Sequence, residues 1–218
     1  MELHQIEVCL DSSDPQMRMK AIAHLKNHTP DVVVPLLKRR MYDQEFMIRS
    51  FVAMGLGFQR SEEGFQLLVQ MIETDRDPNV RAQAANSLSK FGDLAIPHLM
   101  TLFKRDVHWL VRQSILAAME GLEHPDSLLQ LCLWGLESDN LQVKLAAIAN
   151  LGALSVTSMA ETALTVLLSL AVDRDAEVRA QVARVLRGFD APQAQAALFE
   201  LRQDGDYRVV AATLEGLL

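Results

Sequence analysis

A short motif, a basic residue followed by small and branched apolar residues, recurs seven times along the chain. We call its basic position the anchor. The anchors are Arg18, Arg49, Arg81, Arg112, Lys144, Arg179 and, in the last copy, Val210. Successive anchors lie 31, 32, 31, 32, 35 and 31 residues apart. A fixed period of this length indicates an array of repeats, each of which packs only against its neighbours.

Three further positions keep their character from repeat to repeat. A large apolar residue lies seven places after the anchor, at Leu25, Leu56, Leu88, Met119, Leu151, Leu186 and Leu217. Four places before it are mostly good helix N-caps, namely Asp14, Glu45, Asp77, His108, Asn140, Asp175 and Asp206. Six places before it lies a second acidic column, Asp43, Asp75, Asp106, Asp173 and Asp204. We expect the second column to cap helices and to pair with anchor bases of neighbouring repeats.

The other half of each repeat is also an amphipathic helix, as in VVVPLLKRRM and EGFQLLVQMIE. No segment alternates apolar and polar residues as a half-buried strand does, so the predicted fold class is all-α. Each repeat is then a pair of helices, with the anchor on the second one. We expect residues 1–218 to form a single array, with second-helix anchors near residues 18, 49, 81, 112, 144, 179 and 210.

The charge balance argues against some classes of partner. The net charge is −7, whereas binding to duplex nucleic acid requires a basic face. Residues 1–60 hold eight Lys/Arg and seven Asp/Glu, and residues 61–218 hold 13 and 21. The slightly basic N-terminal part would suit an acidic partner, but we interpret the difference as ordinary surface variation.

The location of the protein is predicted from features that the sequence lacks. No stretch is apolar enough for a transmembrane helix, and the first residues, MELHQIEVCLDSSD, do not resemble a signal peptide. Two cysteines make no disulfide framework. We therefore expect a cytoplasmic protein without membrane insertion.

No pattern of catalytic residues is recognisable. The carboxylates recur at the repeat period, as a structural role predicts, and Gly55 and Gly57 do not complete a dinucleotide-binding motif. His24 and His28 share a helix face, but no further metal ligand lies near them in the sequence. Cys9 and Cys132 are four repeats apart and cannot share a metal. The sequence therefore predicts no catalytic site, no metal and no cofactor.

A partner surface is expected on the second helices, which line the concave face of such arrays. Positions two, five and nine after the anchor should face this groove. They predict an apolar hot spot at Phe51, Met54 and Phe58, and polar partner-binding residues at Gln83, Asn86, Lys90 and Arg184. The alternative is that tight curvature buries the three apolar side chains between repeats. Two other aromatic residues, Phe46 and Trp109, lie just after the N-caps of their helices. One alternative is a second exposed aromatic feature on a turn, but we expect both side chains to pack under the inter-helix turns.

The segments QEFMIRSFVAMGLG, DPNVRAQAANSLSKFGDLAIPHL, HWLVRQSIL and DYRVVAATLEGLL resemble the short HEAT-like repeats of the cyanobacterial phycobilisome lyase-like family. The family includes bilin lyase subunits, a phycobilisome-degradation protein and a HEAT-repeat protein that interacts with the iron–sulfur assembly factor IscA. The resemblance implies a right-handed α-solenoid of seven HEAT-like helix pairs.

The resemblance also implies a function. We expect a non-enzymatic adaptor or chaperone-like module that holds a client protein, either a phycobiliprotein or an IscA-type iron–sulfur assembly factor. The alternative is a bilin lyase or bilin-detaching enzyme, or a subunit of one, which would bind a bilin. No residue here singles out bilin chemistry. An iron–sulfur carrier would need a cluster shared between chains, because the cysteines are far apart. The sequence leaves the oligomeric state open.

Overall fold

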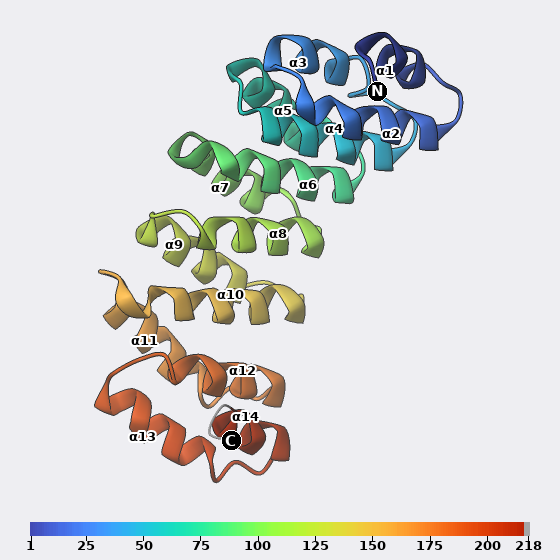
Figure 1. Ribbon diagram of the computed structural model, residues 1–218. Coiled ribbons are helices and arrows are strands. Elements are labelled where there is room, and N and C mark those ends of the chain that lie inside the picture. The colour runs from blue at the N-terminus through green and yellow to red at the C-terminus, as the bar shows by residue number, and fades with distance from the viewer. Residues whose placement is uncertain (216–218) are drawn as a thin grey trace. The chain divides into compact units, whose positions relative to one another are not determined.

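The computed structural model describes residues 1–215, and within them fourteen α-helices alternate with short turns and no strand occurs. The helices form consecutive antiparallel pairs (Figure 1). We call the members of each pair the first and the second helix. The predicted all-α fold with seven helix pairs is therefore confirmed.

The first helices are α1 (Leu3–Leu10), α3 (Pro30–Lys38), α5 (Glu62–Thr74), α7 (Ile96–Arg105), α9 (Pro125–Leu136), α11 (Ala160–Leu170) and α13 (Pro192–Leu201). The second helices are α2 (Pro15–His24), α4 (Phe46–Gln59), α6 (Pro78–Leu88), α8 (Trp109–Glu120), α10 (Leu141–Ala153), α12 (Ala176–Leu186) and α14 (Tyr207–Leu214). Short 3₁₀ segments follow three of the second helices, at Leu25–Asn27, Ser89–Ala95 and Leu154–Val156. Every anchor lies on a second helix, as predicted.

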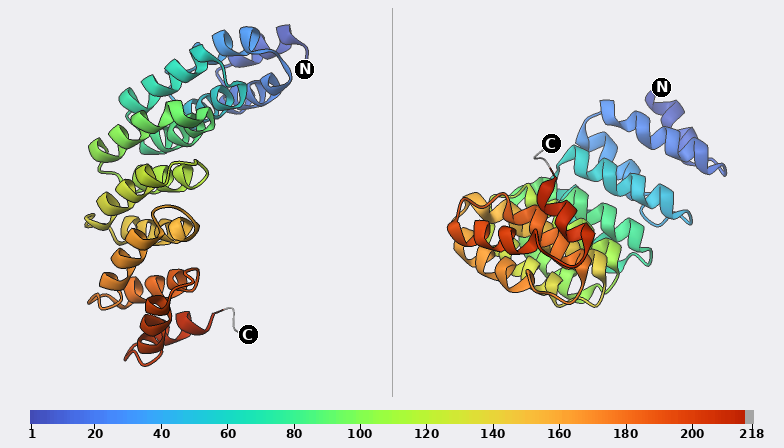
Figure 2. Two further views of the ribbon diagram at one scale, coloured as in Figure 1. Left: turned by 90° about the vertical axis from the view of Figure 1, so that its left-hand side faces the viewer. Right: turned by 90° about the horizontal axis from the view of Figure 1, so that it is seen from below.

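The chain folds as two compact units, residues 1–118 and 119–218, and the division falls inside α8. In the first unit, α4 packs against α2 and α6, while α5 packs against α3 and α7. In the second unit, α12 packs against α10 and α14, and α11 against α13. Each unit thus has a layer of first helices and a layer of second helices, and the left view of Figure 2 shows both layers of residues 1–118 in blue to green. The single right-handed array over residues 1–218 stays a prediction.

The predicted capping residues begin most second helices. The side chains of Asp14, Asp77, Asn140, Asp175 and Asp206 each accept the backbone N–H of the residue two positions later. These bonds satisfy N–H groups that have no partner inside the helix. Glu45 makes no such bond at the start of α4.

The apolar column seven places after the anchor forms the spine of the core. Six of its members are at most 1% exposed, namely Leu25, Leu56, Leu88, Met119, Leu151 and Leu186. Leu217 lies outside the described residues. Burial of each such side chain stabilises the fold by about 1.5–3 kcal/mol. The column therefore contributes one buried side chain to the core of each of these six repeats.

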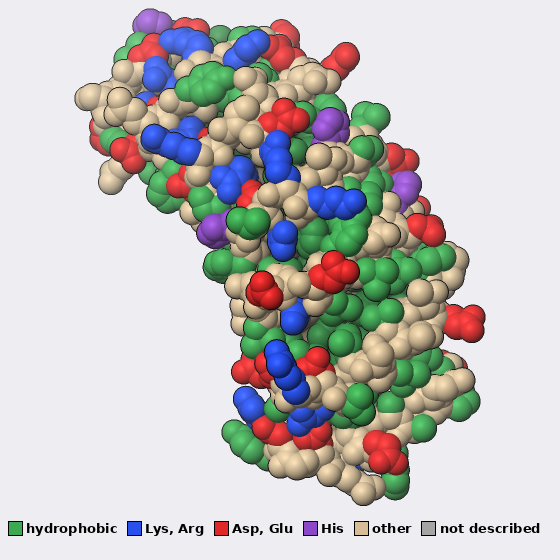
Figure 3. Space-filling view, turned by 180° about the vertical axis from the view of Figure 1, so that it is seen from behind, with side chains coloured by type: hydrophobic (Ala, Val, Ile, Leu, Met, Phe, Trp, Pro, Cys, Tyr) green, Lys and Arg blue, Asp and Glu red, His purple; other side chains and the backbone are tan. Residues whose placement is uncertain are grey.

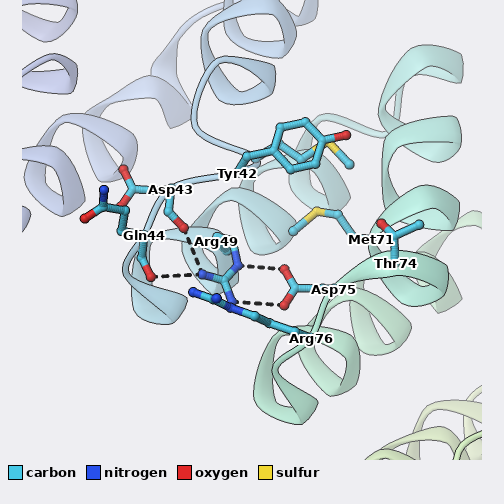
Figure 4. Close-up of a pocket in the computed structure, with 9 residues that line it drawn as sticks. Tyr42, Asp43, Gln44, Arg49, Met71, Thr74, Asp75 and Arg76 are labelled. Atoms are coloured by element: carbon cyan, nitrogen blue, oxygen red, sulfur yellow. Dashed lines mark hydrogen bonds and ion pairs between the residues drawn. The ribbon is translucent and has the colours of Figure 1, made fainter.

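The second acidic column pairs with the anchors, as predicted. Four aspartates each bind the anchor of the preceding repeat, with N–O distances of 2.6–2.8 Å, in the pairs Arg18–Asp43, Arg49–Asp75, Arg81–Asp106 and Arg179–Asp204. The same arginines also donate to the backbone carbonyl six positions before them. Figure 4 shows this arrangement around Arg49, which reaches the carboxylate of Asp75 and the carbonyls of Asp43 and Gln44. Each of these four anchors thereby joins its own inter-helix turn to the next one.

Helices α4 and α6 lie close together at Gly57. A Cβ atom on Gly57 would lie 2.6 Å from the Cβ of Ser87 and 3.0 Å from its Cα. Only a residue without a side chain permits this approach. Ser87 is buried, and its hydroxyl accepts a hydrogen bond from the side-chain amide of Gln83. The close contact therefore also orients a polar residue of the second-helix layer.

Among residues 1–215, every helix is too short or too polar to cross a bilayer.

Candidate functional site

The exposed sides of α2, α4, α6 and the part of α8 up to residue 118 form one surface, which we call the second-helix face of the first unit. Two cavities open on it. An apolar hollow lies between α2 and α4, and a more polar groove runs across α4, α6 and α8. In Figure 1, α6 and α8, in green, lie below α2 and α4, in blue to cyan.

The apolar hollow has a volume of about 250 Å³. It is lined by Ile22, Ala23, Leu25, Lys26, Val33, Leu37, Phe51, Met54, Gly55, Phe58 and Gln59. The residues that α3 contributes, Val33 and Leu37, are buried. The rim is open to solvent, because Met54 is 43% and Phe58 is 62% exposed. Phe51, on the same helix, is half-buried.

Gly55 brings α4 close to α3 at the hollow. A Cβ at this position would lie 2.8 Å from the Cδ1 atom of Leu37, which is fully buried. Since Leu37 cannot move into solvent, a side chain here would push against the lining of the cavity. The glycine therefore allows a closely packed apolar surface beside exposed aromatic and methionine side chains.

The apolar residues of α4 form a stripe along the helix. Met47, Phe51, Met54 and Phe58 are spaced four, three and four residues apart, which places them on one side of an α-helix. The stripe is about 16 Å long at the usual helical rise. Met47 is exposed and belongs to the neighbouring groove, so the stripe connects the two cavities.

The polar groove has a volume of about 410 Å³ and crosses three second helices. It is lined by Phe46, Met47, Ser50, Asn79, Ala82, Gln83, Asn86, Leu110, Ser114 and Ala117. Helix α8 lines it with Leu110, Ser114 and Ala117, and the side-chain amides of α6 supply hydrogen-bond donors and acceptors. The groove can therefore fix the orientation of a bound backbone or polar side chain beside the apolar hollow.

The structure gathers five of the seven predicted partner-binding residues on this face. Phe51, Met54 and Phe58 line the hollow, and Gln83 and Asn86 line the groove. Lys90 is exposed but lines neither cavity. Arg184 belongs to the other unit, where it forms an ion pair with Glu215 at 2.9 Å and lowers the pKa of that carboxyl. The binding role of all seven stays a prediction.

The expected packing of two aromatic residues is wrong. Phe46 is 38% and Trp109 is 42% exposed. Each is the first residue of its helix, and a side chain at that position has no preceding turn of helix beneath it. Phe46 instead lines the groove, together with Met47. Met47 could have been found by extending the apolar pattern of α4 one turn back from Phe51.

The lining of both cavities consists of apolar, amide and hydroxyl side chains together with Lys26. Neither lining includes an Asp, Glu, His or Cys side chain. Within residues 1–215, no group of three or more His, Cys, Asp or Glu side chains is arranged so that it could hold a metal ion. Burial raises the pKa of the Cys132 thiol to about 12, and Cys9 is half-buried in α1. The face offers apolar contact, amide hydrogen bonds and positive charge.

Comparison with known protein families matches the profile described as HEAT repeats to residues 33–120 and 129–218. Comparison with curated proteins gives no match. Among solved structures, the complex of CpcE and CpcF of phycocyanin lyase from Nostoc sp. PCC7120 aligns over 100% of this chain and 95% of that chain, at 19% identity and a TM-score of 0.56. YibA of Escherichia coli aligns over 97% of this chain and 80% of that chain, at 16% identity and a TM-score of 0.66. At these identities the similarity shows the fold alone.

Proposed function

Because the chain belongs to the HEAT-repeat family, we propose that it is a non-enzymatic adaptor or chaperone-like protein that holds a client protein on the second-helix face of the first unit. Stacked helical repeats present extended surfaces of this kind to other proteins. The proposal is supported by the composition of the face, in which apolar anchors stand beside hydrogen-bonding groups.

The observation that carries the proposal is the exposure of Met54 and Phe58 at the rim of the apolar hollow. Single exposed apolar residues are common and need no explanation. Here they stand in one stripe with Met47 and Phe51, above a buried apolar lining. Aromatic and methionine side chains in such a setting are typical of interface hot spots, where burial by a partner contributes most of the binding energy.

The size of the hollow favours a protein over a free small molecule. Small-molecule pockets usually have volumes of about 300–1,000 Å³ and enclose most of the ligand. The hollow, at about 250 Å³, is smaller and takes one or two side chains. The shape therefore supports a client that inserts side chains into the hollow and lies across the adjoining groove.

We propose a phycobiliprotein or an IscA-type iron–sulfur assembly factor as the client. The first choice is supported by the fold shared with the CpcE–CpcF complex of phycocyanin lyase. The same likeness favours the alternative, a bilin lyase or bilin-detaching enzyme. The two functions differ in whether the protein itself binds or transfers bilin.

Purified phycocyanin and a purified IscA-type protein are suitable probes for the adaptor function. Binding is measured by surface plasmon resonance for the wild type and for Met54→Glu/Phe58→Glu. Phe199→Glu is the matched control, because Phe199 is also an exposed phenylalanine, 59% exposed, and lies in the other unit. We expect one probe to bind the wild type and the control, and its affinity for the double variant to fall at least about tenfold. Equal binding to all three proteins contradicts the proposed face, and failure of both probes contradicts the proposed clients.

Free bilin tests the alternative directly. An adaptor leaves the absorbance spectrum of added phycocyanobilin unchanged and transfers none of it to apo-phycocyanin. A spectral shift on mixing, or covalent transfer to the apoprotein, would favour the lyase-type enzyme and contradict the adaptor.

A further inference from the structure

Acidic residues are absent from the helices that form the second-helix face. Helices α2, α4 and α6 contain no Asp or Glu, although residues 1–118 hold 14 of them. In α8 the first acidic residue is Glu120, beyond the first unit. The opposite side of the first unit, in the upper part of Figure 3, shows red acidic and blue basic side chains next to each other. Among the first helices of this unit, α1, α3 and α5 carry acidic residues, whereas α7 carries none.

Free positive charges remain on or beside this face. Lys26 lines the hollow, and Lys20 lies three residues before Ala23, another lining residue, on the same side of α2. Lys90 follows α6. All three are exposed, and none forms an ion pair within the described part of the chain. The anchors differ, since Arg18, Arg49 and Arg81 are each held by an aspartate of the next repeat. The lysines are thus available to a partner.

The apolar stripe has the spacing of a surface that receives a helix. Met47, Phe51, Met54 and Phe58 follow the pattern of about three and four residues by which helices pack together. An amphipathic helix laid in a groove presents its own anchors at positions i, i+3 or i+4, and i+7. The stripe is about 16 Å long and matches roughly three turns of such a helix. An extended peptide would not present side chains at this period.

We propose that the client docks on this face through an acidic amphipathic helix. Its apolar side enters the hollow and covers the stripe of α4, and its flanking Asp and Glu side chains lie near Lys20 and Lys26. This inference rests on the proposed function of the face and adds the chemistry of the partner. Opposite charges around an apolar contact accelerate association and select the partner, and repel a basic helix of the same pattern.

A selection from a displayed peptide library reveals which partner chemistry the face prefers. A phage library of helical peptides, randomised at every surface position, is selected on the wild type and counter-selected on the uncharged variant Met54→Ser/Phe58→Ser. We expect the recovered peptides to carry apolar residues at i, i+3 or i+4, and i+7, with a net negative charge. Recovery of neutral or basic peptides, of peptides without this period, or of none, overturns the inference.

Charge reversal then tests the lysines with a single recovered peptide, by fluorescence anisotropy. We expect Lys20→Glu/Lys26→Glu to weaken binding by about tenfold, and a peptide whose Asp and Glu are replaced by Lys to recover it on that variant. Arg174→Glu/Arg202→Glu is the control, because it makes the same change in net charge at exposed residues of the other unit. Equal loss in both variants overturns a local role for the lysines.

Two further arms separate the possible failures. Vesicles of phosphatidylserine and phosphatidylcholine should not bind the wild type, and lysine-dependent vesicle binding would assign the face to a membrane surface instead. Suppose that client binding requires Met54 and Phe58 but is unchanged in the lysine variant. The adaptor function then stands and the acidic helix is wrong. If the peptides behave as expected but no proposed client competes with them, the partner chemistry stands and the client assignment is wrong.

Discussion

Arg49 and Asp75 form a two-pronged ion pair, with Nε 2.7 Å from Oδ2 and the second guanidinium nitrogen 3.0 Å from Oδ1. Both side chains are largely buried, at 6% and 8% exposed. A third nitrogen of Arg49 donates to the carbonyl of Asp43. Because Asp43 and Asp75 lie in the inter-helix turns of successive repeats, Arg49 fastens one repeat to the next (Figure 4).

The first prediction concerns this pair. Asp75→Asn removes the negative charge and leaves the guanidinium of Arg49 buried without it. Loss of one partner of a buried pair costs about 3 kcal/mol or more. We therefore expect the free energy of unfolding to fall by about 3 kcal/mol, measured by urea titration followed by circular dichroism.

A matched control is the exposed pair Lys38–Glu63, whose nitrogen and oxygen are 2.8 Å apart. Both side chains are about half exposed, and such pairs contribute about 0–1 kcal/mol. Glu63→Gln should therefore leave unfolding almost unchanged. If Asp75→Asn and Glu63→Gln lowered the free energy of unfolding equally, the buried pair would stabilise the fold no more than the exposed pair does.

The second prediction concerns pH. The Arg179 guanidinium holds the pKa of Asp204 below its ordinary value of 3.8. A carboxyl with a depressed pKa in the folded state stabilises the fold above its unfolded pKa, and this contribution is lost as the pH falls through the folded value. We expect the difference in unfolding free energy between the wild type and Asp204→Asn to be constant at neutral pH and to shrink below about pH 4.

The comparison with the variant is needed because other groups titrate in the same range. Arg208 lowers the pKa of Asp206 to about 2. Denaturant titrations at a series of pH values give the difference directly. A difference that persists or grows in acid would contradict the role given to Asp204.

The third prediction concerns the contact between α4 and α6. Gly57→Ala places a Cβ against the Cβ and Cα of Ser87, so that backbone has to shift. Overpacking of this kind costs about 1–3 kcal/mol. Replacing glycine by alanine inside a helix gains at most about 1 kcal/mol, so the cost outweighs the gain. We expect a lower melting temperature. Gly55→Ala, which meets only the terminal methyl groups and Cγ of Leu37, should lower it less. The reverse order would contradict this packing.

The fourth prediction concerns the cysteines. Burial raises the pKa of the Cys132 thiol to about 12, and the thiolate is the reactive form. We expect iodoacetamide at pH 8 to label Cys9 in the native protein and Cys132 only after denaturation. Peptide mass spectrometry separates the two sites. Labelling of both at the same rate in the native state would show that the core around Cys132 opens readily.

Much of the fold could be predicted because the same pattern of apolar, capping and charged residues recurs seven times. The apolar column seven places after the anchor, which reaches Leu186 in the described residues, was expected to be buried in the core. The acidic residues before each anchor were expected to cap helices or to form ion pairs with basic anchors. These are short-range relations, repeated at one period. The period also predicted that the acidic column pairs with anchors of neighbouring repeats, as Asp75 does with Arg49.

The site was less predictable because exposure depends on how neighbouring helices tilt. Phe51, Met54 and Phe58 share one side of α4, yet the sequence left open whether adjacent repeats would cover them. In the structure, α3 packs against α4 where Gly55 meets Leu37, and Met54 and Phe58 stay exposed. Likewise, the charge of residues 1–60 looked like ordinary variation until α2, α4 and α6 were seen to share one acid-free face.

The most direct test of the account is photo-crosslinking from position 58. A photoreactive phenylalanine analogue replaces Phe58 in one sample and Phe199 in another, in the cells that make the protein. We predict a covalent adduct with a client protein from position 58, identified by mass spectrometry, and none with that protein from position 199. No adduct from position 58, or the same adducts from both positions, would contradict a client-binding role for the second-helix face.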